Sequence, residues 1–241
     1  MTKNEYIPFP VKILKKTNES TDTFTLRLNW LVKHEPGQFI QISIPGIGEA
    51  PISISSYSNK YLEITIRKVG NVTNNLFKLE KGDEVLVRGP YGKGYPMKEL
   101  KGNNLIFIGG GCGVAPLKGA IDYVEKNRKD YGNIVLFIGY RSPKDILFSH
   151  KHKDWGDKFK IYLSVDEAAP ETCYSGNVGF ITKTLEKEQI SNKNTVVFMC
   201  GPSIMMEKSA QILENKKFKD KQIYISTERL MYCAFGLCCH C

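Results

Sequence analysis

Four cysteines crowd the last nine residues of the 241-residue chain, with a spacing that suits a metal-binding loop. Cys233, Cys238 and Cys241 follow the pattern Cys-x4-Cys-x2-Cys, which is the spacing of plant-type [2Fe–2S] loops. Gly236 favours a cluster, because such loops fold tightly and offer backbone N–H groups to the sulfurs. Zinc is the competing ion, since Cys and His in a short tract also suit Zn²⁺, and a tail without metal is the third possibility. We predict an iron–sulfur segment.

A glycine-rich turn between a strand and a helix is the second candidate site. The apolar run Leu105–Ile108 is too short for a helix and rich in β-formers, so it predicts a buried strand. Four glycines follow within five residues: Gly109, Gly110, Gly111 and Gly113. A helical pattern then begins, with Pro116 in the place of a first helical residue. Converging backbone N–H groups at a helix N-terminus favour a bound phosphate, and a tight turn without a ligand is the alternative.

Four further stretches stand at the ends of predicted strands. They are Ala50–Ser56, Ile66–Asn74, Gly139–Leu147 and Met199–Met206. The serines of the first could bind a polar ligand, and the basic pair and glycine of the second could hold an anion. In the third, a basic residue at the strand end could reach an adenosine phosphate or ribose. The alternatives are an ordinary strand, a plain strand–turn–helix, a solvated loop and, for the cysteine of the fourth, a buried structural thiol.

The first hundred residues read as an all-β unit. Short alternating runs bounded by Gly, Pro and Asn predict strands: Val11–Lys15, Thr23–Leu28, Gly37–Ile44, Ile52–Ser55, Tyr61–Arg67 and Asp83–Arg88. Closely spaced short strands suggest a small antiparallel barrel. One helix is expected at Val72–Leu79, with Thr73 or Asn71 as its cap.

From about residue 103 strands alternate with helices. The expected strands are Leu105–Ile108, Ile134–Tyr140, Lys160–Val165, Thr195–Met199 and Gln222–Ile225. The expected helices are Pro116–Lys129, a segment near Asp145–Lys151, Phe180–Lys187 and Ser203–Asn215. This rhythm predicts a doubly wound parallel sheet, which binds ligands at the carboxyl ends of its strands.

Composition limits the function classes. The net charge of +9 comes from lysines spread along the whole sequence, whereas a nucleic-acid binder more often concentrates its charge on one element. The N-terminus lacks the apolar stretch of a signal peptide, and no apolar run approaches the length of a membrane span. We therefore expect a cytoplasmic protein without a membrane span and without nucleic acid as a partner. Disulfides would be unusual there, which favours metal binding by the cysteine tail.

In this order the stretches resemble the ferredoxin–NADP reductase superfamily, and the resemblance covers nearly the whole chain. The motifs that carry it are Gly48–Ser55, Arg67–Thr73, Arg88–Pro96, Gly109–Pro116 and Cys200–Met206. They resemble the branch of electron-transfer subunits that end in a [2Fe–2S] segment, which serve anaerobic sulfite reductase, soluble hydrogenases and dihydroorotate dehydrogenase. Within that branch, Gly176–Gly179 and Thr227–Cys233 are most similar to the electron-transfer subunit of anaerobic sulfite reductase.

The resemblance implies three parts. Residues 1–101 are expected to form an antiparallel, FAD-binding β-barrel domain. Residues 102–225 are expected to form an α/β domain, with a doubly wound parallel sheet, that binds NAD(P)H. Residues 226–241 are expected to form a cysteine-rich [2Fe–2S] segment.

The resemblance also assigns site residues. Those expected to line the isoalloxazine ring of FAD are Pro51, Ile52 and Ser53. Those expected to hold the FAD pyrophosphate are Arg67, Gly70, Val72 and Thr73. Those expected to meet the nicotinamide nucleotide are Gly110, Gly111, Gly113, Arg141, Asp166 and Cys200. Ile66, Gly201 and Pro202 complete the cofactor-binding set, and the expected metal ligands are Cys233, Cys238 and Cys241.

Two positions depart from the family pattern. Ala50 stands where many relatives have an arginine, so flavin phosphate binding is expected to rest on Arg67 and backbone amides. Relatives continue past the position of Cys241 to a fourth cysteine, and Cys239 stands where they usually have glycine. Either this sequence is cut short or the cluster site is incomplete.

The resulting functional hypothesis is an NAD(P)H-dependent flavin oxidoreductase. It would pass electrons from NADH, the preferred donor, through FAD and a [2Fe–2S] cluster to a siroheme- and iron–sulfur-containing sulfite reductase subunit. The cofactors supply the chemistry, so no catalytic side chain is expected. One alternative is the electron-transfer subunit of a soluble hydrogenase or a dihydroorotate dehydrogenase. Another is a non-catalytic, zinc-tailed sensor of nucleotide or redox state.

Overall fold

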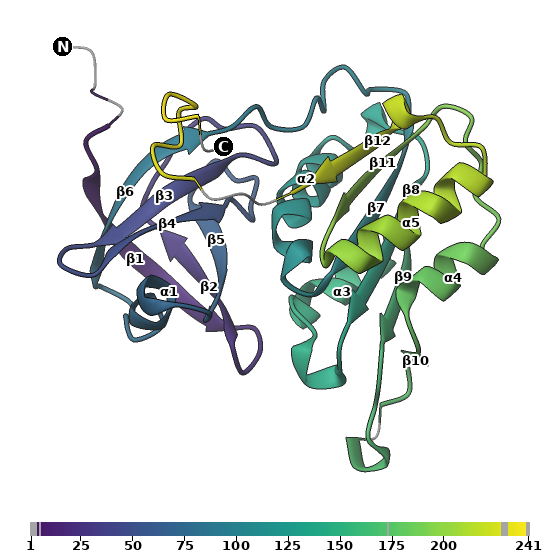
Figure 1. The fold of residues 1–241 in the computed structure, drawn as a ribbon, viewed down its shortest axis with the longest axis horizontal. Coiled ribbons are helices and arrows are strands. Elements are labelled where there is room, and N and C mark those ends of the chain that lie inside the picture. Colours follow the sequence, from purple (N-terminus) through teal and green to yellow (C-terminus); the bar gives the residue numbers. More distant parts are fainter. Residues whose placement is uncertain (1–3, 5, 173, 228–230, 240–241) are drawn as a thin grey trace.

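Two β-sheets lie side by side in the computed structural model, which describes residues 4, 6–172, 174–227 and 231–239 (Figure 1). The strands of the first sheet are β1 (Phe9–Asn18), β2 (Thr23–Leu28), β3 (Phe39–Ile44), β4 (Gly48–Ser53), β5 (Leu62–Arg67) and β6 (Glu84–Tyr91). Those of the second are β7 (Asn104–Gly110), β8 (Ile134–Tyr140), β9 (Lys160–Val165), β10 (Asn177–Val178), β11 (Thr195–Cys200) and β12 (Ile223–Ser226). The predicted fold class is confirmed.

The first sheet closes into a barrel. Its strands pair antiparallel in the order β4-β3-β6-β1-β2-β5. A bridge between Ile54, just after β4, and Ile64 in β5 joins the two edges. Inward-facing apolar side chains such as Phe24, Leu26 and Ile40 are fully buried, because alternate residues of each strand point into the barrel. The helix α1 (Asn71–Leu76) lies against β3 and β4.

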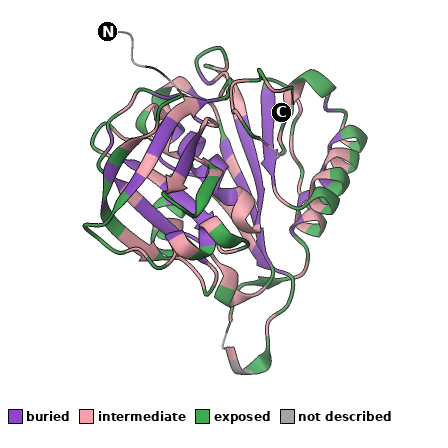
Figure 2. Cartoon of the chain, turned by 60° about the vertical axis from the view of Figure 1, so that its left-hand side comes forward, coloured by how far each residue is buried: buried purple, intermediate pink, exposed green. Residues whose placement is uncertain are grey.

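The second sheet is parallel throughout, with the strand order β10-β9-β8-β7-β11-β12. Its helices are α2 (Val114–Lys126), α3 (Ser149–Gly156), α4 (Ile181–Lys187) and α5 (Ser203–Asn215). The first two cover the face nearer the barrel and the last two the other face, so that the central strands are buried on both sides (Figures 1 and 2). This is the doubly wound arrangement predicted from the alternation of strands and helices. Among the residues described, none of the helices has the length and apolarity that a membrane span requires.

Four helix starts differ from the prediction, and that of α4 differs by one residue, since it begins at Ile181 rather than Phe180. The helix α2 begins at Val114 rather than Pro116, because the 3₁₀ turn Gly111–Gly113 leads straight into it, and proline is tolerated in a first turn. The helix α3 begins at Ser149 rather than near residue 145, because Phe148 adopts a left-handed conformation with φ of 55°. The helix α1 has Gly70 as its N-cap rather than Asn71 or Thr73.

The barrel and the parallel sheet meet along a surface that we call the seam. On the barrel side it is formed by β5 and by the segment Ile54–Tyr57 that follows β4. On the other side it is formed by α2 and by the turn Gly111–Gly113, which contacts β5. The ring of Tyr57 packs on the ring of Tyr123 in α2, with centroids 4.7 Å apart. The carboxyl end of β7 therefore opens toward the barrel.

Candidate functional site

The glycine turn after β7 lies against the end of β11. A Cβ placed at Gly110 would lie 2.5 Å from Met205 Sδ and 2.9 Å from Pro202 Cδ. A Cβ placed at Gly113 would lie 2.5 Å from the carbonyl oxygen of Cys200. Only glycine allows this approach of the two chain segments. The structure thus brings together the predicted residues of the turn and of the β11 end, including Gly201, in a backbone cradle at the carboxyl edge of the sheet.

The predicted anion-binding arginine comes from the other side of the seam. Arg67 ends β5, and its Nε donates to Asp22 Oδ2 at 2.8 Å. Partial burial raises the pKa of Asp22, but hydrogen bonds from Arg67, Thr23 and Ser20 outweigh burial and hold that pKa below its usual value. The same pairing raises the pKa of Arg67, with a contribution from Cys112 in the glycine turn. Arg67 therefore stands near the glycine turn, and it is oriented by Asp22.

The turn between β5 and α1 is organised by Thr73. Its hydroxyl oxygen accepts hydrogen bonds from the backbone N–H groups of Val69 and Gly70, both at 3.0 Å, and it donates to the Gly70 carbonyl at 3.1 Å. Thr73 and the Gly70 amide are thereby engaged within the turn. Val72 packs toward the start of β4, since a Cβ at Gly48 would lie 3.2 Å from Val72 Cγ2. Four predicted phosphate-site residues thus share one turn, in which Thr73 shapes the loop.

The strand predicted to line the flavin is an edge strand of the barrel. Pro51 is exposed, while Ile52 and Ser53 are half-buried. Proline suits an edge, where its missing N–H costs no ladder hydrogen bond. Ile66, in β5, points into the barrel core with 1% exposure, so its side chain packs among core residues and does not face a ligand. A planar apolar ring could lie on the open edge of β4.

Arg141 and Asp166 lie at the carboxyl ends of neighbouring strands, β8 and β9. The pairing of Tyr140 with Val165 places them side by side, and the Asp166 N–H donates to the Tyr140 carbonyl at 2.9 Å. Arg141 is exposed, and its Nε lies 3.8 Å from Glu167 Oε1. Partial burial, with the nearby charge of Glu167, raises the pKa of Asp166. Both residues are at the sheet edge where the resemblance places the adenosine half of a nucleotide.

The cysteine tail folds back onto the barrel near β3 and β6, where it is drawn in yellow (Figure 1). Cys233 Sγ accepts hydrogen bonds from the N–H groups of Phe235 at 3.4 Å and Cys238 at 3.5 Å. Ala234 and Gly236 have φ of 67° and 83°, which turns the loop tightly around that sulfur. Amides directed at a thiolate are what an iron–sulfur loop supplies. The two described cysteines of the motif therefore fit a cluster.

The structure describes only part of the predicted set of metal ligands. Cys241 lies outside the described residues. Within the described part of the chain, no three His, Cys, Asp or Glu side chains form a metal-binding group. Cys239 is exposed and has φ of 59°.

Two buried cations were missed by sequence reasoning. Arg88 in β6 donates to both carboxylate oxygens of Glu49, to the Cys233 carbonyl at 3.0 Å and to the Tyr232 carbonyl at 3.4 Å. Lys118 in α2 lies at the seam with 4% exposure. Only the position of each cation in the sequence could have indicated its burial. Each stands among apolar residues, in a strand or helix that has one buried face.

Comparisons with known proteins agree with this architecture. The family model described as oxidoreductase NAD-binding domain matches residues 107–211. The gamma subunit of sulfhydrogenase 1 from Pyrococcus furiosus is 36% identical over 252 residues, which cover 99% of this chain and 85% of that protein. The probable dihydroorotate dehydrogenase B (NAD(+)), electron transfer subunit, of Methanocella arvoryzae is 31% identical over 237 residues, with 97% and 84% covered.

A solved structure shows the same fold. The ferredoxin NADP+ reductase from Neisseria gonorrhoeae with bound FAD and NADP superposes with a TM-score of 0.74 at 19% identity, covering 90% of this chain and 97% of that one. The similarity of fold and the relatives that align along nearly the whole of this chain therefore indicate the same family. The chain belongs to the ferredoxin–NADP reductase-like family of NAD-binding oxidoreductases, together with the electron-transfer subunits named above.

Proposed function

We propose that this chain is the electron-transfer subunit of a hydrogenase- or dihydroorotate dehydrogenase-type complex, with NADH as its electron donor. The observation that carries the proposal is the juxtaposition at the seam. Arg67 from the barrel stands beside the glycine turn of the parallel sheet. The relatives named above belong to sulfhydrogenase and dihydroorotate dehydrogenase systems, so they favour this reading over sulfite reductase as the partner.

The residues fit FAD on the barrel side and a nicotinamide nucleotide on the other. When bound at these residues, FAD would supply the conversion between the two-electron chemistry of a nicotinamide and one-electron transfer to a partner. The Nε of Arg67 is taken by Asp22, and the terminal nitrogens of an arginine fork suit phosphate oxygens. The glycine turn would hold the nicotinamide nucleotide by its backbone, and Ser53 and Cys200 would flank the reacting rings.

The test is reconstitution. The purified chain, incubated with FAD and desalted, should stay yellow and should bleach anaerobically on addition of NADH. A chain that binds FAD but is reduced by neither NADH nor NADPH would contradict the proposal. The genes beside this one indicate which partner it serves. We expect one of them to encode the catalytic subunit of a hydrogenase or of a dihydroorotate dehydrogenase, whereas a gene for a sulfite reductase subunit would favour sulfite reductase as the partner.

Replacing Arg67 with methionine is expected to weaken FAD binding about tenfold, since one charge-assisted contact to phosphate is lost. Lys68→Met is the matched control, because the Lys68 ammonium lies 4.0 Å from the centroid of the Phe77 ring rather than beside the glycine turn. FAD titration by fluorescence quenching measures both variants. Equal affinity in Arg67→Met and the wild type would remove Arg67 from the site.

We further propose that Cys233, Cys238 and Cys241 are three of the four ligands that an iron–sulfur cluster needs in the tail. Cys233→Ser and Cys238→Ser are each expected to reduce bound iron to background after anaerobic reconstitution, because a thiolate ligand is lost. Cys239→Ser should bind as much iron as the wild type. Zinc without iron in the wild-type protein would contradict the assignment, and it would favour a sensor over an electron carrier.

A further inference from the structure

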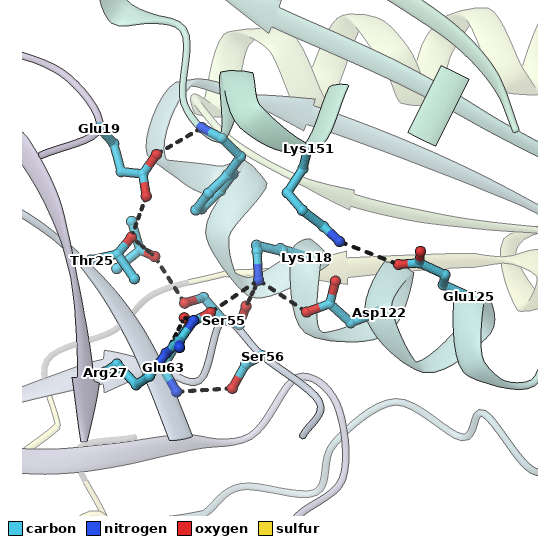
Figure 3. A network of polar contacts seen from close by, with 12 residues as sticks. Glu19, Thr25, Arg27, Ser55, Ser56, Glu63, Lys118, Asp122, Glu125 and Lys151 are labelled. Atoms are coloured by element: carbon cyan, nitrogen blue, oxygen red, sulfur yellow. Dashed lines mark hydrogen bonds and ion pairs between the residues drawn. The ribbon is translucent and has the colours of Figure 1, made fainter. Parts of the chain in front are cut away.

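A buried lysine in α2 reaches across the seam. Lys118 Nζ donates to the Ser55 carbonyl at 2.9 Å and to Asp122 Oδ2 at 3.0 Å, and it lies 3.4 Å from Glu63 Oε2 (Figure 3). Asp122 is on the same helix, whereas Ser55 and Glu63 belong to the barrel. One ammonium group thus binds three oxygens from two parts of the fold.

The backbone of α2 is in contact at the same place. A Cβ at Gly119 would lie 3.3 Å from the Ile54 carbonyl oxygen and 3.5 Å from that of Ser56. The helix therefore lies directly on the segment that follows the predicted flavin strand β4. Any change in the length of the Lys118 contact would move the helix relative to that strand.

A second contact joins the barrel to the residue before α3. The Phe148 N–H donates to Glu19 Oε2 at 3.0 Å, and Glu19 Oε1 accepts from the Thr25 hydroxyl at 2.8 Å. Thr25 and Thr65 hydroxyls are 2.9 Å apart, and Thr65 and Ser55 hydroxyls 2.8 Å apart (Figure 3). A chain of hydroxyl groups thus links the two contacts. The second contact holds Phe148, the residue before α3, and Lys118 Nζ lies 5.5 Å from the centroid of the Phe148 ring.

The charged groups of Lys118 and Asp122 in this network are buried. Desolvation lowers the pKa of Lys118, but Asp122 and Glu63 outweigh it, so that its pKa is raised and the ammonium stays charged. Desolvation also raises the pKa of Asp122. Buried ion pairs add little net stability, yet removal of one partner is costly, and such pairs can select one arrangement of packed elements. The contacts are therefore suited to fixing orientation.

We propose that Lys118 is a positioning residue for hydride transfer: it fixes α2, and with it the glycine turn Gly109–Gly113, at one distance and angle from the flavin strand β4. The inference rests on the proposed function, because it assumes FAD on the barrel and a nicotinamide nucleotide at the turn. Lys118 touches neither cofactor site directly. Its effect passes through the helix that begins at the turn.

The test compares Lys118→Met with the wild type in the full-length, FAD-loaded chain. The rate of flavin bleaching at saturating NADH should fall about tenfold, since small misplacements of reacting atoms are costly. The NADH dissociation constant and the rate of oxidation of reduced flavin by ferricyanide, which needs the barrel alone, should stay within a factor of about two. In the chain without cofactors, hydrogen exchange of residues 54–57 should become faster.

Lys158→Met is the matched control, because Lys158, in the turn after α3, pairs with Glu125 of α2 without crossing the seam. It should bleach at the wild-type rate. Asp122→Asn, which weakens the network but keeps its shape, should slow bleaching in the same direction by about threefold and serves if Lys118→Met does not fold. A wild-type bleaching rate in these seam variants, or unchanged exchange at 54–57, overturns the inference. If NADH does not bleach the wild-type chain, the proposed function is refuted instead. The hydrogen-exchange rate of residues 54–57 then still decides whether Lys118 holds the seam.

Discussion

Replacing Gly113 with alanine is expected to lower the free energy of unfolding by about 2 kcal/mol and to weaken NADH binding about thirtyfold, the same energy expressed as affinity. The added Cβ would lie 2.5 Å from the Cys200 carbonyl oxygen and 2.6 Å from the Gly201 nitrogen. Both are backbone atoms at the end of a buried strand, so no side-chain rotation can relieve the contact. The turn must move away from β11, which opens the cradle. Urea unfolding and nucleotide titration of the FAD-loaded chain measure the two effects.

Gly156→Ala is the control for this prediction. A Cβ there would meet only Ile161 Cγ2, at 3.7 Å, near the end of α3. Alanine is the better helix former, so the variant should be as stable as the wild type or more stable by up to about 1 kcal/mol. It should bind NADH normally. If Gly113→Ala also bound NADH with wild-type affinity, the glycine turn would not be the nucleotide site.

Replacing Arg88 with methionine is expected to release the cysteine tail and to lower the free energy of unfolding by about 3 kcal/mol. The Arg88 side chain is 9% exposed, and its contact with Glu49 raises its pKa above the ordinary value. Methionine fills the space but removes the hydrogen bonds that Arg88 donates to Glu49 and to the carbonyls of Tyr232 and Cys233. Alkylation of Cys233 in the metal-free chain, followed by mass spectrometry, should become about tenfold faster, as about 1.4 kcal/mol of easier local opening implies.

A second cation of the barrel, whose side chain is also largely shielded, separates the two effects. Lys16 is also 9% exposed, and its ammonium donates to Glu80 and to the Phe77 carbonyl, beside α1 and not in the tail. Lys16→Met should lower stability while leaving Cys233 alkylation at the wild-type rate. If Cys233 in Arg88→Met were alkylated at the wild-type rate, other contacts would hold the tail. One such contact is the packing of the Phe235 ring between the rings of Tyr6 and Tyr91, whose centroids lie 4.3 and 4.7 Å from that of Phe235.

Local patterns in the sequence were enough for most of the fold. Alternation predicted β2, β3 and β5 to within two residues, and the apolar run before the glycines predicted β7, because strand and turn signals are carried by neighbouring residues. The glycine turn and the end of β11 could be placed on one sheet edge for the same reason. Their close approach at Gly113 follows from the adjacency of β7 and β11, which the parallel order dictates.

What could not be predicted depends on contacts between distant residues. Lys118 and its acceptor Ser55 are 63 residues apart, and Arg88 and Cys233 are 145 apart. A lone lysine or arginine in a sequence suggests solvent, and only its partners reveal burial. The late start of α3 is of the same kind, since the left-handed Phe148 is held by its bond to Glu19 in the barrel.

The central claim is that flavin and nicotinamide sites face each other across the seam closely enough for hydride transfer. Anaerobic stopped-flow bleaching of the FAD-loaded chain with NADH deuterated at either face of nicotinamide C4 tests it most directly. We expect rapid bleaching that is slowed by deuterium on one face and not on the other, because the glycine turn would present a single face of the nicotinamide to the flavin. Bleaching that is insensitive to both labels, or no bleaching of bound FAD, would contradict it.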